Sequence, residues 1–210
     1  RGAPPVVLDD VDEPEEDSDA WEFFGVPILK RHPTILFGQG GSAKSMLALY
    51  VAGKLAEEFP VLYVDWEFSA IDHRKRLRRL FPVVPRRLLY LRCDKPLRDE
   101  SERLAQLIQE HKIGFIVLDS IGAASDGGSA YTRDFDPGTD YFRHVRRLGP
   151  VGSLHVAHPP KHITDDRQAS VFGSVFFTNL ARSIWFMQAA EINATGELNV
   201  GLFHQKNNLG

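Results

Sequence analysis

Short apolar runs alternate with longer segments of helical periodicity along most of this chain. Runs typical of buried strands lie at residues 34–37, 61–64, 88–91, 115–118 and 154–157. Between them, apolar residues recur every three or four positions, which predicts helices over residues 45–58, 72–80, 100–110 and 139–148. Asp72 is the expected N-cap of the second of these helices. Strands separated by helices indicate crossover connections, and therefore a parallel sheet with helices on both faces.

The pattern changes in the last third of the chain. Residues 184–188 and 198–204 are strand-like, and the turn-forming sequence Asn-Ala-Thr-Gly separates them at residues 193–196. Two strands joined in this way favour an antiparallel β-hairpin. The predicted fold class is therefore α/β, with a mostly parallel central sheet flanked by helices and antiparallel edge strands near the C-terminus.

Composition narrows the class of protein. The 210 residues are 43% hydrophobic and 25% charged, which suits one large globular domain and excludes a wholly disordered chain. No apolar run approaches the ~18 residues of a membrane-spanning helix, and no basic-then-apolar signal pattern opens the sequence. Cys93 is the single cysteine, which excludes an internal disulfide and a cysteine-based zinc site. We expect a cytoplasmic protein.

Charge is divided unevenly along the chain. Residues 1–22 hold nine acidic residues against Arg1, whereas the remainder holds 24 Lys and Arg against 19 acidic residues. We interpret residues 1–20 as an acidic flexible lead-in and residues 21–210 as one domain. For the lead-in, a solvated tail or linker is favoured over an acidic interaction motif. The mildly basic domain permits nucleic acid as a partner without requiring it.

The most informative segment reads Leu-Phe-Gly-Gln-Gly-Gly-Ser-Ala-Lys-Ser at residues 36–45, between a predicted strand and a predicted helix. Glycines let successive backbone N–H groups turn toward phosphate oxygens, and the helix N-terminus adds positive potential. In such a loop Lys44 reaches the β and γ phosphates of a nucleotide, and the Ser45 hydroxyl coordinates Mg²⁺. The predicted phosphate-binding residues are Gly38, Gln39, Gly40, Gly41, Ser42, Ala43, Lys44 and Ser45.

The loop departs from the pattern G-x-x-x-x-G-K-[ST] at one position, where Ala43 replaces the second glycine. A methyl group is the smallest intrusion, so we expect binding to be retained with a slightly changed loop geometry. The alternative is a glycine turn before a helix with an incidental lysine. The combination of strand, loop, Lys-Ser and helix argues against it.

Two strand ends supply candidate carboxylates. Asp119 ends an apolar strand and is expected beside the loop and its metal. Glu67 lies just past the predicted strand at residues 61–64, and a strand end fixes a carboxylate better than a loop does. There are two alternatives: Asp65 is the functional carboxylate, or Glu67 is a helix-capping acid. We favour Glu67 because alternation sends both side chains to the same side and only Glu67 clears the strand.

With these three elements in order, the chain resembles the RecA-like ATPases and, more narrowly, the RepA-type hexameric helicase ATPases of plasmids and phages. The resemblance covers most of residues 21–210. The narrower likeness rests on Val-Ala-His-Pro-Pro-Lys at 156–161, Phe-Gly-Ser at 172–174, Asn-Leu-Ala-Arg-Ser at 179–183 and Lys-Asn-Asn-Leu-Gly at 206–210. It implies that Asp119 orients the metal and the water, that Glu67 activates the water, and that His158 senses the γ-phosphate.

The same resemblance implies that loops 122–136 and 161–170 follow single-stranded DNA in a ring. Acidic residues in both loops offset the basic ones, so solvated loops are the alternative. The Arg-Lys-Arg-Leu-Arg-Arg run at 74–79 favours a solvated helix, with an inter-subunit or nucleic-acid contact second. Rings of this class supply a cation from the neighbouring subunit. The usual Lys-x-Arg reads Lys-Asn-Asn here, so Lys206 is the candidate, with Arg182 and Arg167 as fallbacks.

The sequence therefore predicts a magnesium-dependent ATPase that binds ATP and Mg²⁺. We expect the motor domain of a hexameric, ring-forming helicase that acts on single-stranded DNA in plasmid or phage replication, with no membrane partner. One alternative is a nucleotide-gated regulatory or recombination-accessory ATPase that does not translocate. A small-molecule kinase is less favoured, because the sequence offers no lid with paired arginines.

Overall fold

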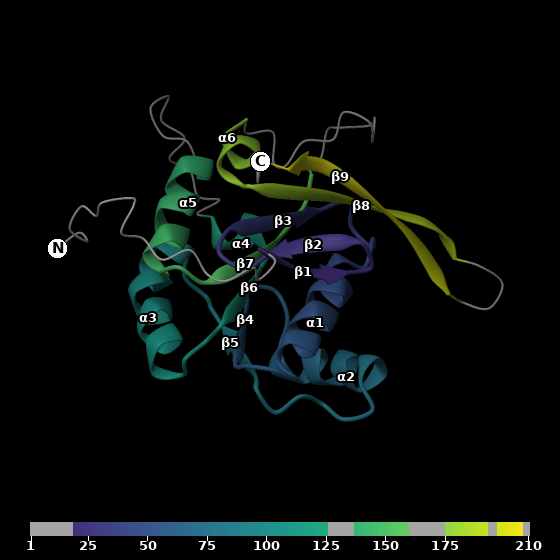
Figure 1. The fold of residues 1–210 in the computed structure, drawn as a ribbon, viewed down its shortest axis with the longest axis horizontal. Coiled ribbons are helices and arrows are strands. Elements are labelled where there is room, and N and C mark those ends of the chain that lie inside the picture. The colour runs from purple at the N-terminus through teal and green to yellow at the C-terminus, as the bar shows by residue number, and fades with distance from the viewer. Residues whose placement is uncertain (1–18, 126–136, 160–174, 193–196, 208–210) are drawn as a thin grey trace.

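The fold is built on one seven-stranded sheet, seen in a computed structural model that describes residues 19–125, 137–159, 175–192 and 197–207 (Figure 1). The strand order is β5-β4-β6-β7-β3-β8-β9. All neighbouring strands are parallel except β8 and β9, which are antiparallel at one edge. This confirms the predicted fold class. The strands are β3 (Pro33–Phe37), β4 (Val61–Asp65), β5 (Leu88–Arg92), β6 (Phe115–Asp119), β7 (Gly152–Ala157), β8 (Ser183–Ile192) and β9 (Leu198–Asn207).

Helices cover both faces of the sheet. They are α1 (Lys44–Leu55), α2 (Ala70–Leu80), α3 (Leu97–Glu110), α4 (Ile121–Ala124), α5 (Pro137–Arg147) and α6 (Val175–Leu180). In Figure 1, α3 and α5 lie on one side of the sheet and α1 and α2 on the other. None of the helices in the described ranges combines the length and the apolar composition needed to cross a bilayer.

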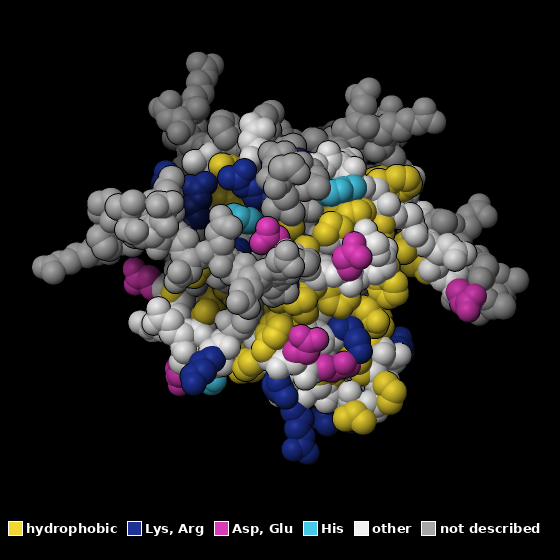
Figure 2. Space-filling model, in the orientation of Figure 1, with side chains coloured by type: hydrophobic (Ala, Val, Ile, Leu, Met, Phe, Trp, Pro, Cys, Tyr) yellow, Lys and Arg dark blue, Asp and Glu magenta, His cyan; other side chains and the backbone are white. Residues whose placement is uncertain are grey.

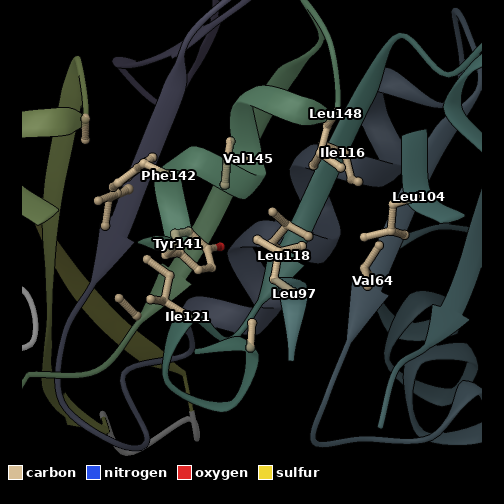
Figure 3. Packing of buried hydrophobic residues seen from close by; sticks show 14 of the residues in the cluster. Val64, Leu97, Leu104, Ile116, Leu118, Ile121, Tyr141, Phe142, Val145 and Leu148 are labelled. Atoms are coloured by element: carbon tan, nitrogen blue, oxygen red, sulfur yellow. The ribbon is translucent and has the colours of Figure 1, made fainter. Parts of the chain in front are cut away.

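Each central strand contributes to both cores by alternation. Ile116 and Leu118 of β6 pack with Leu104 of α3 and Phe142 of α5 (Figure 3). Phe115 and Val117 of the same strand join the opposite cluster, with residues of α1. A strand buried on both faces has no polar side, which is why β6 reads as an unbroken apolar run in the sequence.

A two-stranded hairpin that the sequence analysis missed precedes the main sheet. Strands β1 (Ala20–Phe23) and β2 (Val26–Leu29) pair antiparallel around Phe24 and Gly25, whose φ angles are 54° and 73°. Two positive φ values fit a tight hairpin turn, but Phe-Gly lacks the Asn or Asp that usually marks one in sequence. The predicted lead-in boundary at residue 20 therefore falls inside β1.

Helix α2 begins earlier than predicted, and Asp72 is not its N-cap. Ser69 is the N-cap, and its hydroxyl oxygen accepts a hydrogen bond from the Asp72 backbone N–H at 3.3 Å. The Asp72 carboxylate in return accepts the Ser69 backbone N–H, which completes a capping box. Asp72 is thus the third residue of the helix, because the Ser-x-x-Asp spacing satisfies two N–H groups where an Asp cap alone satisfies one.

Candidate functional site

Four adjacent strands of the sheet end at one edge, and each is followed by residues that the sequence analysis singled out. Residues 38–45 connect β3 to α1, Glu67 lies two residues beyond β4, Asp119 ends β6, and His158 follows β7. These strands are neighbours in the order β4-β6-β7-β3 and run parallel. Their carboxyl ends therefore meet, at the edge where open α/β sheets bind ligands.

The loop at residues 38–45 is held by hydrogen bonds from the Lys44 side chain and by its contact with β8. The Lys44 Nζ donates hydrogen bonds to the Gln39 carbonyl oxygen at 2.7 Å and to the Ser42 hydroxyl at 3.3 Å. Gly38 lies so near β8 that a Cβ there would meet the Met187 carbonyl oxygen at 2.0 Å. The start of the loop is thus fixed by its contact with β8, and the rest of the loop folds around the Lys44 ammonium group.

Ala43 occupies a backbone conformation that favours glycine. Its φ is 63° in the left-handed region, directly before the first residue of α1. This conformation costs an L-residue with a Cβ roughly 1–2 kcal/mol. The departure from the usual loop pattern thus introduces local backbone strain at Ala43.

Burial changes the protonation of Lys44. The side chain is 4% exposed, and this burial lowers the pKa of its ammonium to about 8, while the carboxylates of Asp119 and Glu67 act in the opposite direction. The cation therefore lies within the electrostatic field of both carboxylates. An anionic ligand in the loop would stabilise the charged form further.

Asp119 is buried and held from two sides. The Tyr63 hydroxyl donates to its Oδ2 at 2.7 Å, and Ser45 forms a second side-chain hydrogen bond with it. Burial raises the pKa of Asp119, and these two hydrogen bonds oppose the shift. The pair of Ser45 and Asp119 offers adjacent hard oxygen ligands of the kind that Mg²⁺ takes.

The residues present fit a magnesium ion that arrives with a nucleotide. Among the described residues there is no group of three or more His, Cys, Asp or Glu side chains that could hold a metal ion. Mg²⁺ in phosphate sites is usually held by one or two protein ligands together with phosphate oxygens and water. The Ser45 hydroxyl and the Asp119 carboxylate satisfy that requirement.

Glu67 and Asp65 have different surroundings. Asp65 is fully buried; its Oδ1 accepts the backbone N–H groups of Glu67 and of Phe68, the latter at 2.8 Å, and its Oδ2 contacts His73 Nε2. Glu67 is exposed, and its Oε1 accepts a hydrogen bond from the Ser120 hydroxyl at 2.7 Å. β4 ends at Asp65, so Glu67 lies beyond the strand, as the sequence analysis expected.

His158 is half-buried at the same edge. Burial lowers the pKa of its imidazole, the charge of Lys44 lowers it further, and the charge of Glu67 raises it. The imidazole is thus close enough to both groups to respond to their charges. A neutral imidazole has one N–H donor for a phosphate oxygen and one acceptor nitrogen.

Comparison with known proteins agrees with this geometry. The model of the AAA domain family matches residues 4–162, which is more than half of the chain. The chain belongs to this AAA domain family. Among solved structures, the KaiC-like protein PH0186 from the hyperthermophilic archaeon Pyrococcus horikoshii OT3 is similar with a TM-score of 0.66 at 16% identity, over 87% of this chain and 82% of that one. A search of curated proteins finds no match.

The family, the fold and the loop together identify a RecA-like P-loop ATPase that binds nucleotide. Beside its phosphate loop lies an apolar groove of about 790 Å³, between the first turn of α1 and the β8–β9 hairpin. Ala43, Met46, Leu47, Met187 and Val200 are among the residues that line the groove. Apolar walls next to phosphate donors suit the flat base of a nucleotide.

Other predicted residues of this ATPase do not join the cluster. Lys206 pairs with Ile184 near the start of β8, and Arg182 directly precedes that strand, so both lie at the amino-terminal edge, opposite the phosphate loop. The Lys206 Nζ donates to the Asn179 carbonyl oxygen at 3.0 Å. Arg167, loop 161–170 and most of loop 122–136 fall outside the described residues.

Three residues that the sequence analysis did not assign support the cluster. Tyr63 holds Asp119, Ser120 holds Glu67, and His73 holds Asp65. Ser120 could have been found as the residue after the strand-end carboxylate. Tyr63 depends on the register of β4 against β6, and His73 depends on the packing of α2, which no local sequence pattern encodes.

The closed loop predicts different effects for two glycines. Gly38→Ala should abolish nucleotide binding or destabilise the fold, because its Cβ overlaps the Met187 carbonyl oxygen. Gly40→Ala is the matched control, since a Cβ there meets no atom within 4 Å. Calorimetric ATP affinity and thermal unfolding of both variants test this. Equal behaviour of the two variants would contradict the described loop geometry.

Replacing Ala43 with glycine should leave nucleotide binding intact. Relief of the left-handed backbone strain favours the folded state, and the greater freedom of glycine in the unfolded chain opposes it. We expect the unfolding free energy to change by less than about 1 kcal/mol. Urea unfolding and ATP titration measure both quantities. A large loss of affinity would mean that the loop binds phosphates in another conformation.

Nucleotide binding should take up protons near pH 8. Because the pKa of free Lys44 is about 8, this group is about half protonated there, and bound phosphates raise its pKa. The bound state then holds more protons, so affinity falls as the pH rises above 8. Calorimetry in two buffers of different ionisation enthalpy should show uptake of about half a proton at pH 8 and little from this group near pH 6.5. No uptake at pH 8 would rule out a buried, half-charged Lys44.

Proposed function

We propose that this ATPase is a magnesium-dependent ATP hydrolase and the motor domain of a ring-forming helicase that acts on single-stranded DNA in plasmid or phage replication. The observation that carries the hydrolase part of the proposal is the cluster of Lys44, Ser45, Asp119, Glu67 and His158 at one sheet edge. The helicase part rests on the sequence resemblance alone. In this proposal Lys44 is the cation that binds phosphate, and Ser45 and Asp119 are the metal ligands. Glu67 is a separate, exposed carboxylate. Hydrolysis requires each of these groups.

In this proposal each residue has one role. Lys44 leaves the Gln39 carbonyl and bonds the β and γ phosphates, and the Ser45 hydroxyl and the Asp119 carboxylate hold the metal. When bound, Mg²⁺ would neutralise part of the phosphate charge. Glu67 accepts a proton from the attacking water while the Ser120 hydroxyl fixes its orientation. His158 donates its N–H to the γ-phosphate.

Oligomerisation is proposed because Lys206 is remote from its own phosphate loop. It lies at the amino-terminal edge of the sheet, and the loop at the carboxyl edge. A role for Lys206 in hydrolysis therefore requires a neighbouring subunit whose loop faces it. The expected arrangement is a hexameric ring in which DNA passes along loops 122–136 and 161–170.

A second candidate function is a nucleotide-gated regulatory module that hydrolyses ATP slowly and does not translocate. A KaiC-like protein shares the fold over 87% of this chain, so the fold accommodates this function as well as the first. Turnover with and without single-stranded DNA separates the two functions. The helicase proposal expects a severalfold stimulation by DNA and a ring in the presence of a nonhydrolysable ATP analogue. Slow turnover that DNA does not change would favour the regulatory module.

Exchange of two neighbouring carboxylates for amides tests the general base. Glu67→Gln should leave ATP bound and lower the hydrolysis rate by roughly 10²–10⁴, because the amide keeps the Ser120 contact without accepting a proton. Asp65→Asn should instead reduce stability, since Asp65 is buried against His73 and two backbone N–H groups. Single-turnover hydrolysis and thermal unfolding measure both effects. The reverse pattern would make Asp65 the base.

Mixed oligomers test the trans role of Lys206. Lys206→Ala should preserve ATP binding and lower hydrolysis, by less than an arginine finger would, because lysine is a point charge without a planar fork. Mixing Lys206→Ala with Glu67→Gln subunits should partly restore turnover, since some interfaces then pair an intact Glu67 with an intact Lys206. Wild-type turnover by assembled Lys206→Ala would exclude this role and turn attention to Arg182 and Arg167.

A further inference from the structure

A second cavity lies at the sheet edge opposite the phosphate loop. Its volume is about 330 Å³, and it opens where β3, β6 and β7 begin and where α5 ends. Ile116, Phe142 and Leu180 contribute apolar walls. The cavity lies away from the phosphate loop of its own chain, because that loop follows the other end of β3.

Three arginines give this cavity a positive charge. Arg31, Arg146 and Arg182 line it and are exposed, His32 lies beside them, and no Asp or Glu is among the described lining residues. No carboxylate in the described part of the chain forms an ion pair with any of the three. Figure 2 shows Lys and Arg side chains gathered in the region of α5 and α6. We call this cavity the arginine pocket.

The positive charge extends beyond the pocket itself. Burial lowers the pKa of Lys206, and the nearby charge of Arg182 lowers it further. Like charges that gather repel one another, and a carboxylate-rich ligand relieves that repulsion. Arginine is suited to this task, because its planar fork accepts carboxylates in pairs of hydrogen bonds.

The acidic segment of this chain meets the fold beside that pocket. Asp19 pairs with the end of β2, where its carbonyl oxygen accepts the Lys30 backbone N–H at 2.9 Å. Arg31 and His32, the next two residues after Lys30, line the pocket. The residues before Asp19 therefore reach the fold within one or two residues of Arg31. Seven acidic residues lie between positions 9 and 17: Asp9, Asp10, Asp12, Glu13, Glu15, Glu16 and Asp17.

We propose that residues 9–17 of this chain dock into the arginine pocket. Nine residues reach roughly 30 Å when extended, which is ample for a segment tethered at the pocket mouth. The short tether keeps the local concentration of the segment at millimolar levels, so weak ion pairs suffice. Val11 and Pro14, which interrupt the acids, match the apolar walls. The segment is then an interaction motif, contrary to the solvated tail favoured from sequence.

A labelled peptide tests the docking on the full chain. The host is the full chain with the seven acids replaced by Asn or Gln, which removes the competing segment. The probe is a fluorescent peptide with the sequence of residues 1–19, followed by anisotropy at low salt. We expect saturable binding that weakens at least tenfold in the wild-type chain, because its own segment occupies the pocket. Binding should also weaken as salt rises.

Matched charge reversals identify the site. Arg31→Glu with Arg146→Glu in the host should weaken peptide binding at least tenfold. Arg78→Glu with Arg79→Glu, two exposed arginines on α2, makes the same charge change elsewhere and should alter binding less than twofold. If the first pair lowers the thermal midpoint, Arg31→Gln with Arg146→Gln replaces it, with the same expectation of weaker binding.

Three results would overturn the proposal. The first is equal peptide affinity in the wild-type chain and the host. The second is equal weakening by the pocket pair and the α2 pair, which would mean that net charge alone attracts the peptide. The third is an oligothymidylate of the same length binding through Arg31 and Arg146 more tightly than the peptide, which would make the pocket a nucleic-acid contact.

Discussion

Parallel pairing of four neighbouring strands is the constraint on which the site depends. Because β4, β6, β7 and β3 run in one direction, their ends bring together groups that lie as far apart as Lys44 and His158 in sequence. The pairing is stabilised by burial of β6 on both faces, where Ile116 and Leu118 face one core and Phe115 and Val117 the other. A register shift would turn these side chains to the wrong faces and displace Asp119 from Ser45.

The two edges of the sheet carry different chemistry. At the carboxyl edge, one buried cation lies in the field of two carboxylates, so its charge is finely balanced and responds to an incoming phosphate. At the amino-terminal edge, three exposed arginines have no carboxylate partner among the described residues. The first arrangement suits a small, highly charged ligand. The second suits an acidic chain segment.

A feature could be predicted from the sequence when its signal lies within a few adjacent residues, and not when it depends on contacts between distant segments. The phosphate loop and the strand-end carboxylates were predicted because their signals lie within a few adjacent residues. Ser69 was missed as the N-cap because Asp72, the last residue of the same Ser-x-x-Asp box, is itself a common N-cap residue. The β1–β2 hairpin was missed because its turn, Phe24-Gly25, lacks the residues that usually mark one. The contacts of Tyr63 and His73 depend on register and helix packing, which no short pattern encodes.

The central claim is that ATP occupies one site assembled from four strand ends. Hydrogen–deuterium exchange of the full chain, with and without a nonhydrolysable ATP analogue and Mg²⁺, tests it directly, because exchange reports local opening of each segment. We expect simultaneous protection of residues 38–47, 65–68, 119–121 and the segment around His158. Protection confined to the loop, or centred on the amino-terminal edge of the sheet, would contradict it.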